Sequence, residues 1–253
     1  MKSITDMTTE AFEVEGAERK GPWLLTCDHA SNAVPGFVSG GDLGLAAADM
    51  NRHIAYDVGA AGVTRHLARL LDAPCVLSRF SRLVIDPNRG EDDPTLIMQL
   101  YDGTLIPGNR VLEAKERARR LDRLYRPYHS AVDQLLAGRD ATYVAIHSFT
   151  PQLNGRPPRP WHVTVLSTQD KRFSDPLLER LGAEPDLCIA ENEPYTGELR
   201  GDGVDRHAVK QGRPNALIEI RNDLIETASD QQAWAERLAP LLRAAHEDMR
   251  CDV

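Results

Sequence analysis

Short apolar runs alternate with longer amphipathic segments along this chain, and this alternation limits the possible folds more than any other feature. A short apolar run is typical of a buried strand, whereas apolar residues spaced by three and four positions indicate a helix. The runs that predict strands lie at residues 23–27, 75–77, 83–85, 143–146, 163–166 and 216–221. The spacings that predict helices cover residues 46–71, 109–137 and 231–249. Pro127 predicts a kink in the second of these helices. The alternation predicts an α/β protein with a three-layer α/β/α architecture.

Length and charge set further bounds. At 253 residues, 42% of them hydrophobic, the chain can bury a sizeable core, and we expect a single domain over residues 1–253. The net charge of −8 argues against a nucleic-acid partner, although a few local arginines could still hold a small anion. The sequence contains no signal for an oligomeric state.

The sequence also bears on location. No apolar stretch approaches the roughly 18 residues of a membrane span, so we expect no membrane partner. The first residues lack the basic and apolar regions of a secretory leader, and the four cysteines form no CxxC pair. A soluble, cytoplasmic protein is therefore expected.

Two histidines stand where apolar runs stop. His29 follows the first strand in LLTCDHASNAVP, and His147 closes a later one in YVAIHSFTP. In open α/β sheets, ligand sites form beyond the carboxyl ends of the strands, so the two side chains could converge on one metal ion. The alternative is that each histidine only bonds the backbone of a neighbouring loop.

A glutamate interrupts the last predicted strand. Glu219 lies among apolar neighbours in ALIEIR, where an unpaired carboxylate is costly to bury, and burial should raise its pKa. Arg221, two residues on, would share its strand face and could hold it in place. The alternative is a purely structural ion pair of Glu219 with Arg221 or with Arg82.

Five motifs together point to a family. DHASNAVP, RLVIDPNRG, HSFTP, ENEPYTG and IEIRNDL occur in this order across residues 20–225, and the combination resembles the N-formylglutamate amidohydrolase family. The resemblance implies a fold related to zinc carboxypeptidases and aspartoacylases, which have an α/β/α sandwich around a mixed central sheet. It also implies hydrolysis of a small N-acyl amino acid, with N-formyl-L-glutamate giving formate and glutamate as the type reaction, and a place in histidine degradation.

The resemblance implies a divalent metal, most simply zinc, with His29 as its first ligand and His147 as its last. The carboxypeptidase relatives supply another ligand through an HxxE motif, but here that position is Asn32. An asparagine oxygen is a poor zinc ligand, so Asp28, Asp57 or a water molecule could complete the site. We take Asp57, which lies within the predicted helix 46–71, as the third ligand. Zinc, cobalt, nickel and iron all accept such ligands.

Further roles follow from the same resemblance. Arg82 would polarise the scissile carbonyl, Asn88 and Arg89 would grip a substrate carboxylate, and Glu219 would act as the general base. A planar guanidinium suits a carboxylate because it can donate two parallel hydrogen bonds. The alternatives are that Arg89 only braces the turn at Asp86 and that Arg82 is an ordinary surface residue.

The remaining candidates lie late in the chain. Asn192 and Tyr195, in ENEPYTG, are expected to line the substrate pocket, and Arg221 is taken as another substrate-binding residue. His207 could be a second acid–base group or an ordinary helix-start histidine. Against the enzyme stands a non-catalytic relative that binds a small carboxylate, in which Asn32 marks a lost metal site.

Overall fold

The computed structural model describes residues 7–251, and its centre is a mixed eight-stranded sheet in the order β1-β2-β4-β3-β7-β10-β8-β9. β4, β3, β7 and β10 run parallel to one another. β2 and β8 pair antiparallel with β4 and β10, and β1 and β9 complete the two edges. The strands of the sheet are β1 Met7–Thr8, β2 Phe12–Glu15, β3 Trp23–Cys27, β4 Cys75–Ser78, β7 Thr142–Phe149, β8 Val163–Leu166, β9 Ile189–Glu191 and β10 Asn215–Arg221.

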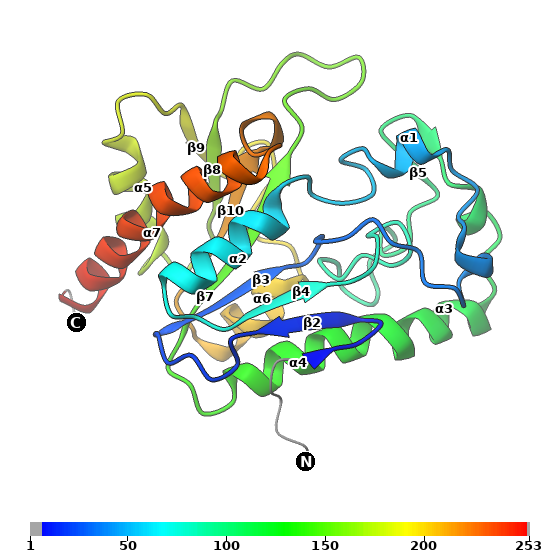
Figure 1. The fold of residues 1–253 in the computed structure, drawn as a ribbon, viewed down its shortest axis with the longest axis horizontal. Coiled ribbons are helices and arrows are strands. Elements are labelled where there is room, and N and C mark those ends of the chain that lie inside the picture. Colours follow the sequence, from blue (N-terminus) through cyan, green and yellow to red (C-terminus); the bar gives the residue numbers. More distant parts are fainter. Residues whose placement is uncertain (1–6, 252–253) are drawn as a thin grey trace.

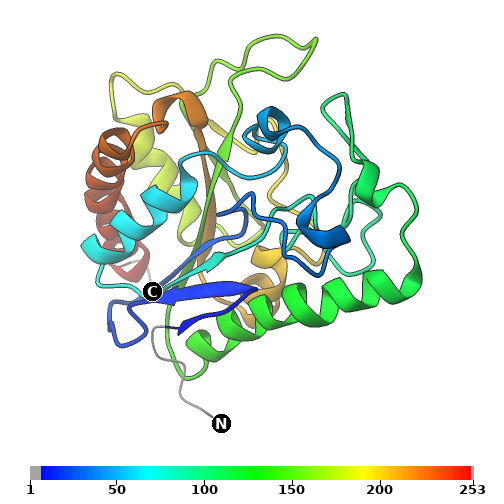
Figure 2. The same ribbon diagram turned by 45° about the vertical axis from the view of Figure 1, so that its right-hand side comes forward.

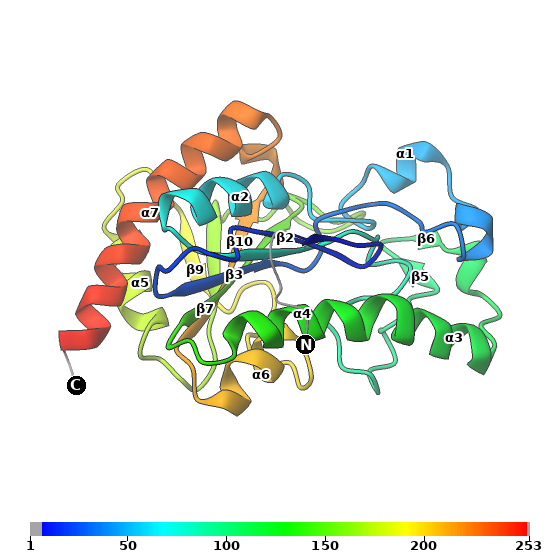
Figure 3. The same cartoon turned by 60° about the horizontal axis from the view of Figure 1, so that its bottom comes forward.

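Helices cover both faces of this sheet (Figures 1 and 3). The helices are α1 Ala47–Met50, α2 Ala60–Leu70, α3 Ala114–Arg120, α4 Arg126–Leu136, α5 Ser174–Gly182, α6 Gly203–His207 and α7 Ala228–Cys251, and β5 Leu100–Tyr101 pairs with β6 Thr104–Leu105 in a small hairpin. α2, α5 and α7 pack on one face, while α4 and α6 lie on the other. The predicted three-layer α/β/α sandwich around a mixed sheet is therefore confirmed.

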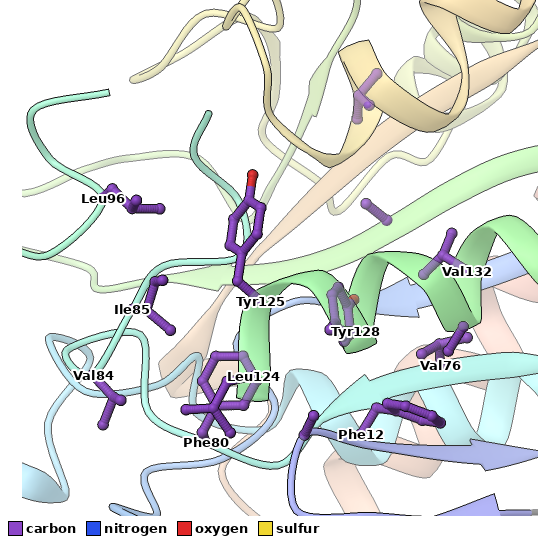
Figure 4. Packing of buried hydrophobic residues seen from close by; sticks show 14 of the residues in the cluster. Phe12, Val76, Phe80, Val84, Ile85, Leu96, Leu124, Tyr125, Tyr128 and Val132 are labelled. Atoms are coloured by element: carbon purple, nitrogen blue, oxygen red, sulfur yellow. The ribbon is translucent and has the colours of Figure 1, made fainter. Parts of the chain in front are cut away.

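Each face of the sheet has its own apolar core. Val144, Ile146 and Ile218 meet α2 and α7 on one side, whereas Tyr143 and Val76 meet α4 on the other. This alternation of neighbouring residues between the two layers is what a strand buried on both faces requires. Figure 4 shows the α4 side, where Leu124, Tyr128 and Val132 pack over the sheet and the segment that follows β4.

The predicted strands are correct with one exception. Leu83–Ile85 form a turn rather than a strand, although all three residues are fully buried. Their backbone is satisfied locally and by other side chains: Ser81 accepts from the amide of Leu83, and Asn109 donates to its carbonyl. A short buried apolar run does not distinguish a strand from an ordered loop.

Two predicted helices are also broken up. Residues 46–71 form the short α1 and the separate α2, and Asp57 lies in the loop between them. In residues 109–137, α3 passes through a π-helical turn, Leu121–Tyr125, into α4, where Pro127 lies in the first turn. Proline has no amide hydrogen to complete the α-helical ladder, and a π-helical turn directly precedes it, while the backbone stays helical through the junction.

The topology places the site. From β3 the chain continues to β4 on one side, and β7 is followed by strands on the other, so β3 and β7 flank a switch point where such sheets bind ligands. The loop between β7 and β8 extends beyond this end of the sheet (Figure 2). Within residues 7–251, no helix has the length and apolar character needed to cross a membrane.

Candidate active site

A cavity of about 350 Å³ opens beyond the carboxyl ends of β3, β7 and β10. This volume lies at the lower end of the range for small-molecule sites. The residues that line it are His29, His53, Asp57, Arg82, Asn88, Arg89, Tyr101, His147, Ser148, Phe149, Thr150, Leu166, Tyr195, Thr196, Gly197, Leu199, Asp202, Leu217 and Glu219.

Three buried side chains converge on one point of the cavity wall. Nδ1 of His29 lies 3.2 Å from Oδ2 of Asp57, and Nδ1 of His147 lies 2.8 Å from the same oxygen. One potential ligand atom from each residue falls within 4.8 Å of the others. The structure thus brings together the three residues that the sequence proposed as metal ligands.

The Nε2 atoms of the two histidines contact buried carboxylates that fix the orientation of each ring. Nε2 of His29 lies 2.7 Å from Oδ1 of Asp86, and Nε2 of His147 lies 3.0 Å from Oδ2 of Asp28. A buried carboxylate thus faces each Nε2. When both ring nitrogens carry a hydrogen, each Nδ1 donates to Oδ2 of Asp57; when Nε2 alone carries it, the lone pair of Nδ1 is free to bind a metal ion. Histidines that bind metals are held by carboxylates in this way.

The charges of the cluster fit a divalent cation. Asp28, Asp57 and Asp86 are all nearly fully buried, and Arg82 is the arginine that contacts two of them. With neutral histidines, these three carboxylates and one guanidinium leave two negative charges. Burial alone would raise the pKa of Asp57, but the charges and hydrogen bonds of His29 and His147 outweigh it and hold that pKa well below its usual range. Burial likewise opposes the charge on His147, yet Asp28 and Asp57 raise its pKa. The site therefore favours a bound cation, whether a proton or a metal ion.

Asp57 reaches this position from a loop. Its amide donates to the carbonyl of His29 at 2.9 Å, and its Oδ2 also accepts from the amide of Ser148 at 3.2 Å. Gly59 then turns the chain into α2 with φ of 80°, close against the carbonyl of Ile225. Only glycine is comfortable there. The prediction that Asp57 sits on a helix is wrong, because this tight turn separates it from α2.

Asn32 does not join the cluster. Its amide nitrogen donates to the carbonyl of Met50 and to Oδ1 of Asn51, and the side chain does not line the cavity. The carboxylate that faces the two histidines belongs to Asp57.

Glu219 lies beside the histidines without a partner. It pairs in register with His147 across the parallel strands β10 and β7, so both side chains leave the same face of the sheet. Among the described residues, no hydrogen bond or ion pair reaches its carboxylate, and burial raises its pKa. The structural ion pairs considered as alternatives are not formed.

Arg221 corrects the expectation for this strand. Its guanidinium donates to Asp223 at 2.8 Å and lies near the carbonyls of residues 159–161, outside the cavity lining. The strand ends at Arg221, so this side chain follows the turn rather than the sheet face, and it does not hold Glu219 in place.

The loop after β4 contributes three predicted residues. Arg82 is no surface residue: it donates to Oδ2 of Asp86 at 2.7 Å and lines the cavity. Asn88 and Arg89 line it as well. The guanidinium of Arg89 donates to the carbonyl of Asn88 and to Thr95, and within residues 7–251 no carboxylate pairs with it. Arg89 therefore does not brace Asp86 through its side chain.

With this geometry in place, similarity to known proteins becomes informative. A family model described as N-formylglutamate amidohydrolase matches residues 21–226. The chain belongs to this family. It is accordingly a hydrolase that acts on an amide bond, and both the family and the enzyme class expected from the motifs are confirmed.

Relatives of the family differ in how closely they match. An N-formylglutamate deformylase of Pseudomonas aeruginosa is 28% identical over 216 residues, which cover 73% of this chain and 77% of that protein. A gene product of Agrobacterium tumefaciens has a crystal structure with a TM-score of 0.89 and 37% identity, covering 95% of this chain and 96% of that one. The N-formylglutamate amidohydrolase of Ralstonia eutropha, at 22% identity, shares the fold with a TM-score of 0.66 over 97% of this chain and 100% of that one.

α4 and the π-helical turn before it support the site of this family member. Tyr128 donates to Oδ1 of Asp28 at 2.5 Å, and Tyr125 donates to the carbonyl of Arg89 at 2.6 Å. Figure 4 shows the Tyr125 hydroxyl directed away from the apolar cluster in which its ring is anchored. Both tyrosines thus bury their rings in the core, and their hydroxyl groups hold Arg89 and Asp28 by hydrogen bonds.

The ENEPYTG motif divides between site and scaffold. Tyr195 lines the cavity, as expected, and its hydroxyl accepts from Arg159 at 3.1 Å. Asn192 does not line it: its side-chain oxygen accepts from the amides of Ser167 and Gly197 and so shapes the loop. The expectation that Asn192 contacts substrate is therefore not met by this structure.

His207, whose role the sequence left open, lies between other partners. Its Nδ1 is 2.8 Å from Asp133 and its Nε2 is 2.8 Å from His129, and it does not line the cavity. It is a buried residue near the end of α6 rather than at its start.

Three titratable residues of the cavity lining were not anticipated. His53 lies in the loop between α1 and α2, inside the range that was predicted as one helix, and Tyr101 ends the short strand β5, which was not predicted. Asp202 accepts from the amide of Asp205 as the N-cap of α6, and burial raises its pKa to about 7. An aspartate directly before a helix is a recognisable capping signal, so Asp202 could have been found as a cap, though not as a cavity residue.

Proposed function

We propose that this chain is a metal-dependent amidohydrolase that converts N-formyl-L-glutamate and water into formate and L-glutamate. The observation that carries the proposal is the convergence of two histidine Nδ1 atoms on Oδ2 of Asp57, beside an unpartnered Glu219. Two nitrogens and one carboxylate oxygen are a ligand set typical of catalytic zinc. The deformylase names of the relatives support formylglutamate as the substrate.

The ligands would be Nδ1 of His29, Nδ1 of His147 and Oδ2 of Asp57. A bound metal would make a water molecule more acidic and stabilise negative charge on the formyl oxygen. The chain performs the proton transfers. Glu219 takes a proton from the attacking water while the water oxygen bonds to the formyl carbon. Glu219 then gives this proton to the amide nitrogen as the C–N bond breaks.

The arginines orient the substrate and stabilise charge. Arg82 would donate to the formyl oxygen as negative charge develops there. Arg89 and Asn88 would hold the α-carboxylate, and the free charge of Arg89 supports this role. Asp86 holds both Arg82 and His29, so one buried carboxylate fixes two parts of the machinery.

Metal content and formate release test this function together. We expect about one equivalent of divalent metal in the purified protein, loss of formate release from N-formyl-L-glutamate on chelation, and recovery with zinc or cobalt. Elemental analysis and a coupled formate assay provide both measurements. Absence of formate release at every metal tested would reject the proposal and favour a protein that only binds a carboxylate.

The carboxylate behind His147 gives a second prediction. Asp28→Asn removes the charge that orients Nε2 of His147, so we expect metal affinity to fall about 10- to 100-fold. Competition with a chromogenic chelator measures this directly. Asp133→Asn is the matched control. Asp133 pairs with His207, which does not line the cavity, so this variant should leave metal affinity unaltered. Equal losses in both variants would contradict the role of Asp28.

A further inference from the structure

A buried arginine beside the cavity has no acidic partner. Arg120 and Arg159 are the buried arginines of the described chain, at 0% and 9% exposure. Arg120 is paired with Glu116. In contrast, no carboxylate within residues 7–251 lies at ion-pair distance from Arg159, whose guanidinium donates only to the carbonyl of Thr150 and the hydroxyl of Tyr195. Burying a charge without a counter-charge is unfavourable.

Two aromatic rings next to the cavity pack near the guanidinium of Arg159. Its guanidinium carbon lies 5.7 Å from the centre of the Phe149 ring and 5.3 Å from that of Tyr195. Arg159 is not itself a lining residue, but Phe149, Thr150 and Tyr195 all line the cavity, so its guanidinium lies directly behind the cavity wall and is hydrogen-bonded to two residues of that wall. Arginine between aromatic rings keeps its planar donors in a fixed orientation, which lowers the entropy lost on binding an anion.

The backbone of Arg159 is fixed as well. Its amide donates to the carbonyl of Pro151 at 2.8 Å, which ties the far end of the proline-rich loop to its start. Arg156, in the same loop, is exposed instead. The position of Arg159 is therefore built by the fold and does not reflect general basicity of the loop.

Charge matching assigns this arginine a ligand. Arg89 and Arg159 both lack acidic partners, whereas Arg82 is neutralised by Asp86. We propose that Arg159 binds the side-chain carboxylate of the substrate and makes the enzyme select N-formylated acidic amino acids over neutral ones. This inference rests on the proposed deformylase function, in which Arg89 takes the α-carboxylate and leaves one carboxylate of formylglutamate without a partner.

Comparison of two nearly isosteric substrates tests the inference. The metal-loaded enzyme is assayed with N-formyl-L-glutamate and with N-formyl-L-glutamine, which replaces the carboxylate by an amide. We expect Arg159→Met to lower kcat/KM for the glutamate substrate roughly 100-fold and to change it little for the glutamine substrate. Arg156→Met removes a charge from the same loop and should alter neither. Arg89→Met should lower both, because both substrates have the α-carboxylate.

Other results would overturn the inference. Equal losses of Arg159→Met on both substrates, or a wild type that does not prefer glutamate, would show that Arg159 does not read the side chain. If Arg159→Met fails to fold, Arg159→Lys replaces it, with an expected loss of about 10-fold on the glutamate substrate alone, since lysine cannot form the paired hydrogen bonds. Unchanged selectivity in that variant would be equally decisive.

Failure of the proposed function is seen separately. A metal-loaded wild type that releases no formate from either substrate would reject the deformylase, whatever Arg159 does. In that case, the affinities for L-glutamate and L-glutamine, measured by calorimetry, still test whether Arg159 binds the side-chain carboxylate. Arg159→Met should weaken binding of L-glutamate and not of L-glutamine, and equal weakening of both would reject the assignment.

Discussion

Replacing Glu219 with glutamine is expected to lower kcat for formate release by about 10³-fold or more, with little change in KM. The substitution keeps the shape of a side chain that no other described residue contacts by a hydrogen bond or ion pair, but it removes the proton acceptor. General acid–base catalysis contributes about 10²- to 10⁴-fold, and here the same carboxylate would serve in both bond formation and bond cleavage. Steady-state kinetics on the metal-loaded enzyme measure the loss.

Stability separates this role from a structural one. Burial raises the pKa of Glu219 in the folded chain, so its ionisation opposes folding once the pH exceeds the pKa of the unfolded state. In the metal-free protein at neutral pH, Glu219→Gln should therefore leave the melting temperature unchanged or raise it. Glu226→Gln, an exposed neighbour beyond β10, is the matched control and should affect neither property. A fall in stability without loss of turnover would make Glu219 structural.

The five central strands, β3, β4, β7, β8 and β10, and the candidate site residues on them and at their ends could be predicted from the sequence because both depend on local pattern. Trp23–Cys27 and Asn215–Arg221 are apolar runs flanked by polar residues, and a histidine or glutamate within such a run is conspicuous. The convergence of His29 and His147 followed from one rule, that parallel strands bring their carboxyl ends to the same edge. In these strands, the tertiary contacts did not override the secondary structure that the local pattern predicts.

The loops could not be predicted in the same way, because their conformation is set by contacts far along the chain. Leu83 and its neighbours resemble a strand, yet Asn109 and Arg120 satisfy the backbone of this buried turn from distant segments. The amide of Asp57 is held by the carbonyl of His29, and no periodicity in the sequence reveals this contact. Arg159 was overlooked for a related reason: its significance comes from the carboxylate that is not beside it, and only the folded chain shows which charges lack partners.

Asp57→Asn is expected to abolish stoichiometric metal binding and to lower kcat/KM by more than about 10³-fold. The substitution is isosteric, but an amide oxygen is a weak ligand for zinc beside two histidines. It also removes one of the three carboxylates that leave the buried cluster negative, so the electrostatic attraction for a divalent cation falls. Elemental analysis after dialysis, together with the formate assay, measures both effects.

Asn32→Ala is the control that gives this result its meaning, because Asn32 occupies the position at which the carboxypeptidase motif has its glutamate. Its amide is engaged with Met50 and Asn51, so the alanine variant should lose about 1 kcal/mol of stability and retain its metal. If instead Asn32→Ala lost the metal and Asp57→Asn kept it, the ligand would follow the motif rather than the geometry. The expected outcome would mean that Asp57, in the loop before α2, supplies the third ligand, and that the position three residues after His29 does not.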